Sequence, residues 1–349
     1  MRVSLLLVVA LLSACARAPA QSGTTLIYAS PYAPSHPFSQ ADQIWIDWVE
    51  QHSNGRLHIH AMWSQSLLSS DQSMTELRHG VADIGLITPI YERGGEQLLR
   101  VQTGFYAGAQ TFTQQVALYR CLQSRFVQLR AEFDGLHILA VQGGALPGLL
   151  TRTRAVLKLD DLHGLRVRAP TEALEVLRSL GADPVDMPMN QVYSALAKGI
   201  IDGVIAPPDT LRSLHFAEVA KYFTNLQLPR GAYPSRAINE RRWQSLSNQD
   251  RLLLTASTPV WEAAMDQRIQ ASVNAGRAFG LTQKVTFCPI AADEQARFDE
   301  LYNRVEVASA HALTRYGLDG DGVFTYARQL AGQIERSGEV RCGTDPGTP

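Results

Sequence analysis

Two spacings of apolar residues follow one another along the first two thirds of the chain. Short apolar or alternating runs occur at 25–30, 56–62 and 82–88, and apolar residues at helical spacing occupy 39–55 and 73–80. Side chains alternate across a strand and repeat about every 3.6 residues on a helix, so these segments predict strands and helices respectively. We expect further strands at 137–143, 148–153, 165–170, 184–187 and 200–206, and further helices at 113–133, 171–181 and 190–199.

After residue 232 the pattern becomes mostly helical, with long helical segments at 248–280 and 293–317. Strands that alternate with helices usually return to the same edge of a sheet, which makes neighbouring strands parallel. The pattern therefore predicts an α/β protein with a largely parallel sheet and long C-terminal helices.

The N-terminus has the features of an export signal. Arg2 precedes a mostly apolar segment of ten residues at 3–12, which is too short for a bilayer, since that needs about 20. The next residues, "LSAC", resemble the bacterial lipobox, in which the cysteine is lipidated and becomes the first residue of the mature protein. We therefore expect a signal peptide at 1–15 that ends at a lipidated Cys15, and a tether at 16–23. The alternative is a plain cleavage site beside a chance cysteine.

Composition adds limits on the partner and on the cysteines. The chain has 349 residues, 45% hydrophobic and 19% charged, with a formal net charge of −1. It can bury the core of two domains, and it carries no basic excess for nucleic acid. With Cys15 lipidated, Cys121, Cys288 and Cys342 remain. An odd number in an exported protein predicts one disulfide and one free thiol, and Cys342 could fix the loose tail expected at 336–349.

Signatures of catalysis and of metal binding are absent from the sequence. It has no G-x-S-x-G, no phosphate loop, no G-x-G-x-x-G and no H-E-x-x-H. His58 and His60 share one face of a strand but lack a third ligand, and Asp319 opens a "DGDG" that fails as a calcium loop and better fits a helix N-cap. We predict no cofactor, no metal and no enzymatic activity.

One short stretch raises a question of its own. "LHGLRVRAP", at 162–170, places Arg166 and Arg168 two residues apart in a short strand with apolar neighbours. In a strand both side chains leave the same face. Either could pair with a ligand, or both could lie on a solvated edge.

Three segments, in order, resemble one family. They are "LRHGVADIGLI" at 77–87, "DLHGLRVRAP" at 161–170 and "LGADPVDMPMNQVYSALAKGIIDGV" at 180–204. Together they are similar to the solute-binding proteins of TRAP (tripartite ATP-independent periplasmic) transporters, over about 25–335. The resemblance implies a two-lobed periplasmic binding protein fold whose cleft closes on a small acid. It implies one lobe of 24–144 plus 232–271 and another of 145–231 plus 272–335.

The resemblance also implies roles for individual residues. The arginine of the Gly-Leu-x-x-Arg-x-Pro element, here Arg168 and not Arg166, forms a bidentate salt bridge with the ligand carboxylate in that family. A guanidinium presents a planar fork of donors that fits both carboxylate oxygens. The further residues that we expect to line the cleft are Thr88, Tyr91, Met189, Tyr233 and His36.

Departures from the family pattern narrow the class of ligands that we expect. Gly148 stands where many acid-binding members carry a second arginine, and Ala206 and Pro207 replace a frequent asparagine. Thr88 and Tyr91 occupy positions where sialic-acid binders have Glu and Arg, and Met189 replaces a common aromatic residue. Each change removes charge or hydrogen-bonding capacity. The sequence therefore predicts a more apolar pocket for one carboxylate.

The leading hypothesis is a lipid-anchored, periplasmic binding protein that delivers a small monocarboxylate to a TRAP membrane permease. A second hypothesis is an outer-membrane-tethered receptor without its own permease, because Ala16 rather than Asp follows Cys15. A third, an enzyme built on this scaffold, has no nucleophile–base pair to support it.

Overall fold

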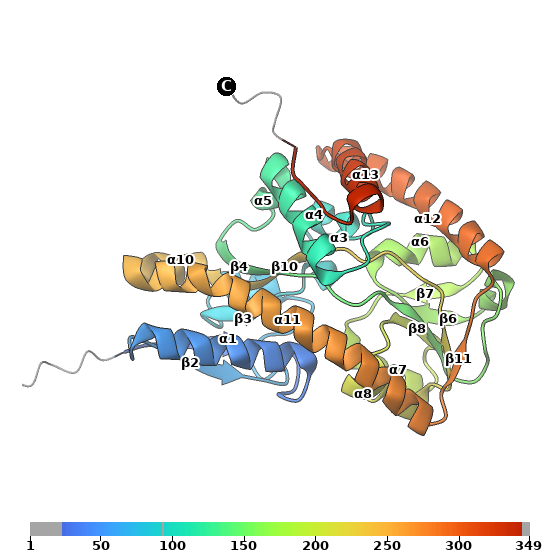
Figure 1. Ribbon diagram of the computed structural model, residues 1–349, viewed down its shortest axis with the longest axis horizontal. Coiled ribbons are helices and arrows are strands. Elements are labelled where there is room, and N and C mark those ends of the chain that lie inside the picture. Colours follow the sequence, from blue (N-terminus) through green and yellow to red (C-terminus); the bar gives the residue numbers. More distant parts are fainter. Residues whose placement is uncertain (1–22, 93, 344–349) are drawn as a thin grey trace, which may run out of the picture.

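The computed structural model describes residues 23–92 and 94–343, and its strands form two sheets (Figure 1). The predicted signal peptide, Cys15 and most of the tether lie outside these residues. The first sheet has the order β2-β1-β3-β10-β4. Its strands are β1 (Thr24–Ala29), β2 (Leu57–Met62), β3 (Ile84–Leu86), β4 (Leu136–Gln142) and β10 (Tyr233–Asn239).

The second sheet has the order β11-β9-β5-β8-β6-β7. Its strands are β5 (Gly148–Thr151), β6 (Arg166–Arg168), β7 (Asp183–Val185), β8 (Gly203–Ala206), β9 (Tyr222–Thr224) and β11 (Thr286–Cys288). The α/β architecture predicted from the alternation of strands and helices is confirmed. The boundaries of the two predicted lobes stay a prediction.

The sheets are mixed rather than largely parallel, which corrects the sequence-based expectation. β10 runs antiparallel to β3 and β4, and β5 runs antiparallel to β8 and β9. The reason lies in two connections without a helix. The chain passes from β4 directly into β5 through 143–147, and from β9 into β10 through 225–232. A strand entered in this way begins at the edge of the sheet where the strands beside it end. It must therefore run antiparallel to those strands.

The helices cover both sheets. α11 (Asn248–Thr282) crosses the length of the molecule and packs on α1 (Pro37–Ser53) at one end and α8 (Thr210–Ser213) at the other (Figure 1). α12 (Ala292–Ala312) and α13 (Gly320–Ser337) pack on each other. The other α-helices are α2 (Ser73–Arg78), α3 (Gln97–Gln102), α4 (Phe112–Arg125), α5 (Val127–Ala131), α6 (Thr171–Ser179), α7 (Met189–Ala197), α9 (Phe216–Val219) and α10 (Glu240–Ser245), and the 3-10 helices are η1 (Pro89–Tyr91), η2 (Leu159–Leu162) and η3 (Leu313–Tyr316).

Two predicted helices are shorter than expected. The segment 113–133 breaks at Phe126, whose extended backbone separates α4 from α5. The segment 293–317 ends its α-helix at Ala312 and continues as η3 up to Gly317, which is left-handed with φ 72°. In both places the apolar spacing continues through a change of backbone conformation, which the spacing alone does not reveal.

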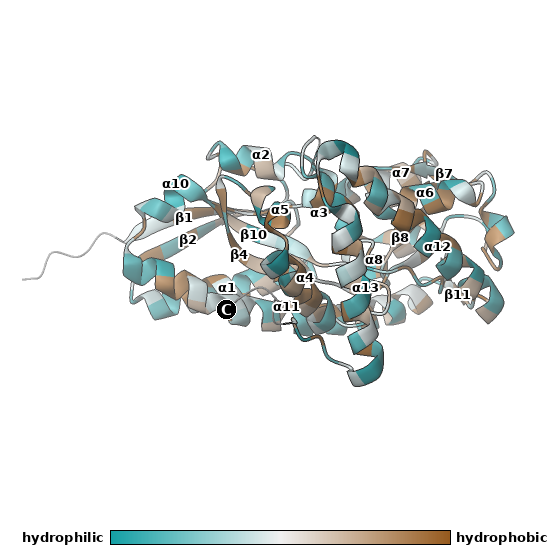
Figure 2. Cartoon of the chain, turned by 90° about the horizontal axis from the view of Figure 1, so that it is seen from above, coloured by the Kyte–Doolittle hydropathy of each residue, from teal (hydrophilic) through white to brown (hydrophobic). Residues whose placement is uncertain are grey.

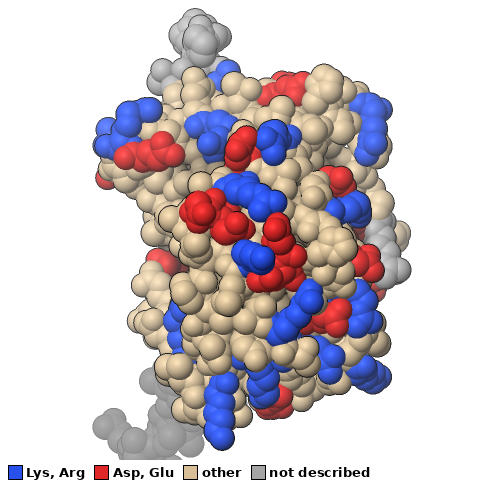
Figure 3. Space-filling model, turned by 90° about the vertical axis from the view of Figure 1, so that its right-hand side faces the viewer, with Lys and Arg blue, Asp and Glu red and all other residues tan. Residues whose placement is uncertain are grey.

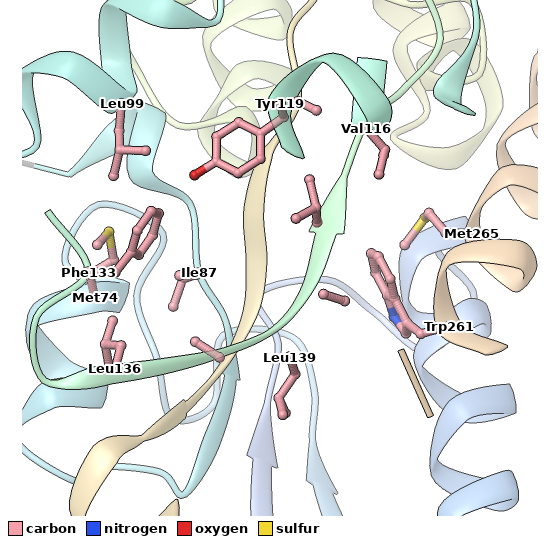
Figure 4. Packing of buried hydrophobic residues seen from close by; sticks show 14 of the residues in the cluster. Met74, Ile87, Leu99, Val116, Tyr119, Phe133, Leu136, Leu139, Trp261 and Met265 are labelled. Atoms are coloured by element: carbon pink, nitrogen blue, oxygen red, sulfur yellow. The ribbon is translucent and has the colours of Figure 1, made fainter. Parts of the chain in front are cut away.

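Apolar side chains fill the space between the layers. The strands and the inner faces of the helices are hydrophobic, and the outer helix faces are polar (Figure 2). The larger core includes Val116 and Tyr119 of α4, Trp261 and Met265 of α11 and Leu139 of β4 (Figure 4). Two smaller clusters lie in the half that contains the second sheet. Burial of these side chains is the main stabilising contribution to the fold.

The cysteines form the predicted one bridge and one free thiol. Cys121 of α4 is bonded to Cys342, and Cys288 is buried and free. The part of the expected loose tail that the structure describes is thus attached to the body, where Gln114 also donates to the carbonyl of Gly338. Asp319 caps α13, as expected of a helix N-cap, by accepting from the backbone N–H of Gly322.

The surface offers no sign of a polyanion site on the face shown in Figure 3, where basic and acidic side chains are interspersed. Among the described residues, no helix combines the length and apolar character needed to cross a bilayer.

Candidate ligand-binding site

A cavity of about 100 Å³ lies between the two sheets, and both contribute to its lining. The carboxyl ends of β3 in the first sheet and of β6 and β8 in the second sheet lie at the cavity, as is usual for ligand sites of α/β proteins. The structure brings together all six side chains that the sequence singled out for the cleft. These are His36, Thr88, Tyr91, Arg168, Met189 and Tyr233.

Arg168 is the most constrained of the six. It is the last residue of β6, which pairs with β7 and β8, and Pro170 ends the strand and precedes α6. Its side chain is buried, with 1% of its surface exposed. Nε donates to the carbonyl of Met187 at 2.8 Å, Nη1 to that of Ile205 at 3.5 Å, and Nη2 to the Tyr91 hydroxyl at 2.7 Å. Strand pairing and these bonds fix the position of the guanidinium.

Arg168 forms no ion pair with an acid in the described part of the chain. Among the described residues, no Asp or Glu oxygen lies within 4.0 Å of its guanidinium. The three hydrogen bonds leave two of its five N–H groups without a protein acceptor in the described part of the chain. A buried cation in this state is a strong attractor for an anion, because the low dielectric around it weakens screening.

Arg166, at the other end of β6, is already paired. Its Nε and Nη2 donate to the two carboxylate oxygens of Asp202, at 2.9 and 2.8 Å. Its side chain is 43% exposed, and Nη2 also donates to the carbonyl of Gly199. The same bonds lower the pKa of Asp202. The two arginines of "RVR" therefore have different partners: Arg166 binds the acid that precedes β8, and Arg168 faces the cavity.

Aromatic side chains make up much of the cavity wall. Tyr32 stacks on His36 with ring centres 4.1 Å apart, and Phe38 meets both rings edge-on. His36 caps α1 by accepting from the N–H of Phe38 at 3.2 Å. Burial, and the nearby Arg236 charge, lower the pKa of His36 to about 3, so the imidazole is neutral. Burial likewise raises the pKa of Tyr233 to about 12.

Thr88 and Met189 differ in what they can offer. The Thr88 hydroxyl already donates to the carbonyl of Ser70, and its backbone N–H donates to Ser73 Oγ at 3.0 Å. Thr88 therefore supports the wall more than it presents a free donor. Met189 begins α7 and is half-buried, which leaves its thioether as an adaptable apolar surface.

Three charged lining residues were missed by the sequence analysis: Arg230, Glu172 and Asp209. Burial raises the pKa of Asp209 to about 6, and burial also raises the pKa of Glu172. Glu172 and Asp209 follow strands β6 and β8, and Arg230 lies in the crossing segment 225–232, so only the tertiary fold brings the three side chains to the cavity. The cavity is therefore less uniformly apolar than the sequence predicts.

Metal binding finds no support in the cavity. In the described ranges, no group of three or more His, Cys, Asp or Glu side chains could hold a metal ion. The arrangement of a buried cation, aromatic walls and neutral donors is suited to holding an organic anion.

Comparison with known proteins agrees with this geometry. Residues 28–309 match the model of the family described as bacterial extracellular solute-binding protein, family 7. A solute-binding protein of Albidiferax ferrireducens is 25% identical over 177 residues, which are 50% of this chain and 52% of that protein. The chain thus matches about half the length of this relative.

Two solved structures have the same fold. A TRAP solute-binding protein from Rhodoferax ferrireducens, solved with copurified benzoate, has a TM-score of 0.78 and 25% identity, covering 90% of this chain and 99% of that one. One from Bordetella bronchiseptica, with bound mandelate, has a TM-score of 0.77 and 19% identity, covering 89% and 99%. The chain belongs to the bacterial extracellular solute-binding proteins of family 7, and its fold is that of TRAP solute-binding proteins.

Proposed function

We propose that this protein captures a small organic monocarboxylate in the cavity between its sheets and delivers it to a TRAP membrane permease. The observation that carries the proposal is Arg168, which is buried at the cavity with two N–H groups and a positive charge that no described side chain neutralises. A ligand carboxylate would supply both acceptors at once.

The walls indicate what the rest of the ligand is like. Tyr32, Phe38 and Tyr91 present rings, and Met189 and Ile205 present aliphatic surface. Aromatic and aliphatic walls favour an apolar body, and a few polar groups fix its orientation. Because the Rhodoferax protein was solved with benzoate, aromatic monocarboxylates are the first class to test, followed by short aliphatic acids.

Capture would proceed by closure of two lobes, 24–144 plus 232–271 and 145–231 plus 272–335. The crossing segments 143–147 and 225–232 and helix α11 connect the two sheets and are the places where a hinge could act. Small-angle scattering should therefore show a smaller radius of gyration when a verified ligand is added. An unchanged radius would contradict closure.

Attachment to the membrane is part of the proposal. Cys15 follows the apolar segment 3–12 at the distance that lipidation requires. Metabolic labelling with a palmitate analogue should mark the wild type and leave Cys15→Ser unlabelled. Equal labelling of the two proteins would contradict a lipid anchor at Cys15.

A thermal-shift screen tests the binding function directly. The panel contains aromatic acids, hydroxy acids, keto acids, fatty acids and the matching amides, which have the same shape without the charge. A ligand present at about a hundred times its Kd stabilises the native state by about 2.7 kcal/mol. We expect at least one carboxylate to raise the melting temperature and its amide to leave it unchanged. A panel in which no carboxylate acts, or in which amides act equally, would overturn the proposed function.

A further inference from the structure

Arg230 is a second cation of the cavity, and it has no ion-pair partner among residues 23–92 and 94–343. It lies in the crossing segment 225–232, just before β10. Its Nη1 donates to the carbonyl of Ala145 at 3.3 Å. As with Arg168, no described Asp or Glu oxygen lies within 4.0 Å of its guanidinium. Its remaining donors are therefore available to a molecule in the cavity.

The opposite crossing segment is shaped to accept this side chain. A Cβ on Gly144 would lie 2.4 Å from Arg230 Cζ, so a larger residue at 144 would displace the guanidinium from this position. Gly144 is held in place by Gln115, which accepts from its N–H at 2.7 Å and donates to its carbonyl at 3.1 Å. Gln115 itself is fully buried. The position of Arg230 is thus built into both segments that connect the sheets.

The charges around Arg230 limit what it can bind. Asp209 and Glu172 line the same cavity and are close enough to Arg230 for its charge to lower their pKa values against the stronger effect of burial. The two arginines already share the cavity with two acids, so when both acids are ionised a ligand carboxylate on Arg168 leaves no excess of positive charge around Arg230. A second ligand carboxylate would add a negative charge beside two acids that are already poorly solvated. We therefore expect the ligand to present a neutral hydrogen-bond acceptor to Arg230.

We propose that Arg230 is a specificity residue that donates hydrogen bonds to a neutral oxygen, a hydroxyl or keto group, of a monocarboxylate held by Arg168. The inference rests on the proposed function and narrows its ligand to oxygenated monocarboxylates. A site built to bond an oxygen discriminates against the analogue that lacks it, since its buried donors are then left unpaired.

Isothermal titration calorimetry with two matched ligand series tests this role. One series is benzoate, 3-hydroxybenzoate and isophthalate, and the other is butanoate, 3-hydroxybutanoate and succinate. Wild type should bind the hydroxyl member of a series at least about tenfold more tightly than the plain acid and the diacid, a difference of about 1.4 kcal/mol. Arg230→Met should bring hydroxyl and plain acid within about twofold, with the plain acid bound at least as tightly as in wild type because no donor is left unpaired.

Matched variants distinguish a specific role of Arg230 in ligand preference from a general loss of ligand binding. Arg241→Met removes an exposed arginine of α10 outside the cavity and should keep the wild-type preference. Gly144→Ala, which displaces the Arg230 guanidinium, should reduce the preference as Arg230→Met does. Arg168→Lys should weaken every member of a series.

Three results would overturn the inference. They are an unchanged preference in Arg230→Met, a wild-type preference for the diacid that depends on Arg230, and no binding of either series. The wider screen distinguishes these results from failure of the proposed function, because that function requires only that some carboxylate bind through Arg168.

Discussion

Two buried arginines, one on each sheet, have different partners: Arg168 lines the cavity, whereas Arg236 does not. Arg236 of β10, 3% exposed, donates from Nε to Asp42 Oδ1 at 2.7 Å and from Nη1 to Gln142 Oε1 at 3.3 Å. Asp42 also accepts from the Tyr28 hydroxyl and from Trp261 Nε1. Arg168 of β6 is as deeply buried but has carbonyls and one phenol as its partners.

The difference separates a structural arginine from a ligand-binding one. A guanidinium keeps its charge at any physiological pH, so a buried arginine needs an anion from the protein or from outside. For Arg236 the chain supplies Asp42, from a helix almost two hundred residues away in sequence. For Arg168 the chain supplies none in its described part, and the open partner position faces the cavity.

Removing the internal anion should have the largest effect. Asp42→Asn gives Arg236 the unneutralised state that Arg168 has, without a cavity to receive an outside anion. Breaking a buried ion pair from one side costs about 3–5 kcal/mol. We expect a loss of this size in the free energy of unfolding, measured by urea denaturation.

Asp202→Asn is the matched control, because it breaks the half-exposed pair with Arg166. Its loss should stay near 1 kcal/mol, as is usual for pairs that water screens. Equal losses in the two variants would mean that burial of the arginine does not decide the role of its partner.

Glu306 of α12 extends the comparison to a buried acid, which, unlike an arginine, can become neutral by taking up a proton. It is 2% exposed, and neither carboxylate oxygen has a hydrogen-bond partner among the described residues. Burial, and the nearby Glu172, raise its pKa well above the usual range. The wild type should therefore lose stability as pH rises above about 4.5, where the unfolded chain ionises and the folded one does not.

Glu306→Gln should remove this part of the pH dependence. The free energy of unfolding of the variant relative to wild type should increase between pH 5 and pH 8, on the order of 1–3 kcal/mol. Denaturant titrations at the two pH values measure the difference. A constant difference across this range would show that Glu306 does not stay protonated in the folded protein.

The smallest expected effect is a pH dependence of ligand binding, caused by the charge of Asp209 beside Arg230. Because the pKa of Asp209 is raised to about 6, by burial, Asp209 is mostly neutral at pH 5 and mostly charged at pH 7.5. A bound carboxylate should therefore be held more tightly at pH 5, by about three- to tenfold. Asp209→Asn should bind with nearly the same Kd at both pH values in calorimetric titrations. A variant that keeps the wild-type pH dependence would assign it to another group.

Sequence reasoning reached further for the site than for the topology. Arg168 was predicted from a family motif, Thr88, Tyr91 and Met189 from their positions in the family pattern, and His36 and Tyr233 as further lining candidates, and all six line the cavity. The antiparallel course of β5 and β10 was missed, since a direct crossing between two sheets leaves no periodic signal in 143–147 or 225–232. The same two segments hold Gly144 and Arg230.

The charged residues missed at the cavity share one physical reason. Glu172, Asp209 and Arg230 are polar positions near loops, where the sequence pattern equally fits solvent-exposed side chains. Only the placement of the two sheets on either side of the cavity brings these positions to its lining. Arg166 and Arg168 could be separated by the family motif, but the role of Asp202 as the partner of Arg166 required the pairing of β6 with β8.

Calorimetric titration of Arg168→Lys and Arg166→Lys, with one acid identified by the screen, tests the role of Arg168 most directly. Lysine keeps the charge at either position but loses the two-point fork, and neither change removes buried apolar volume. Arg168→Lys should weaken binding by about 2–5 kcal/mol, roughly 30- to several-thousand-fold, while Arg166→Lys should leave the Kd nearly unchanged. Loss of binding in Arg166→Lys with wild-type binding in Arg168→Lys would contradict the assignment of Arg168 as the carboxylate-binding residue.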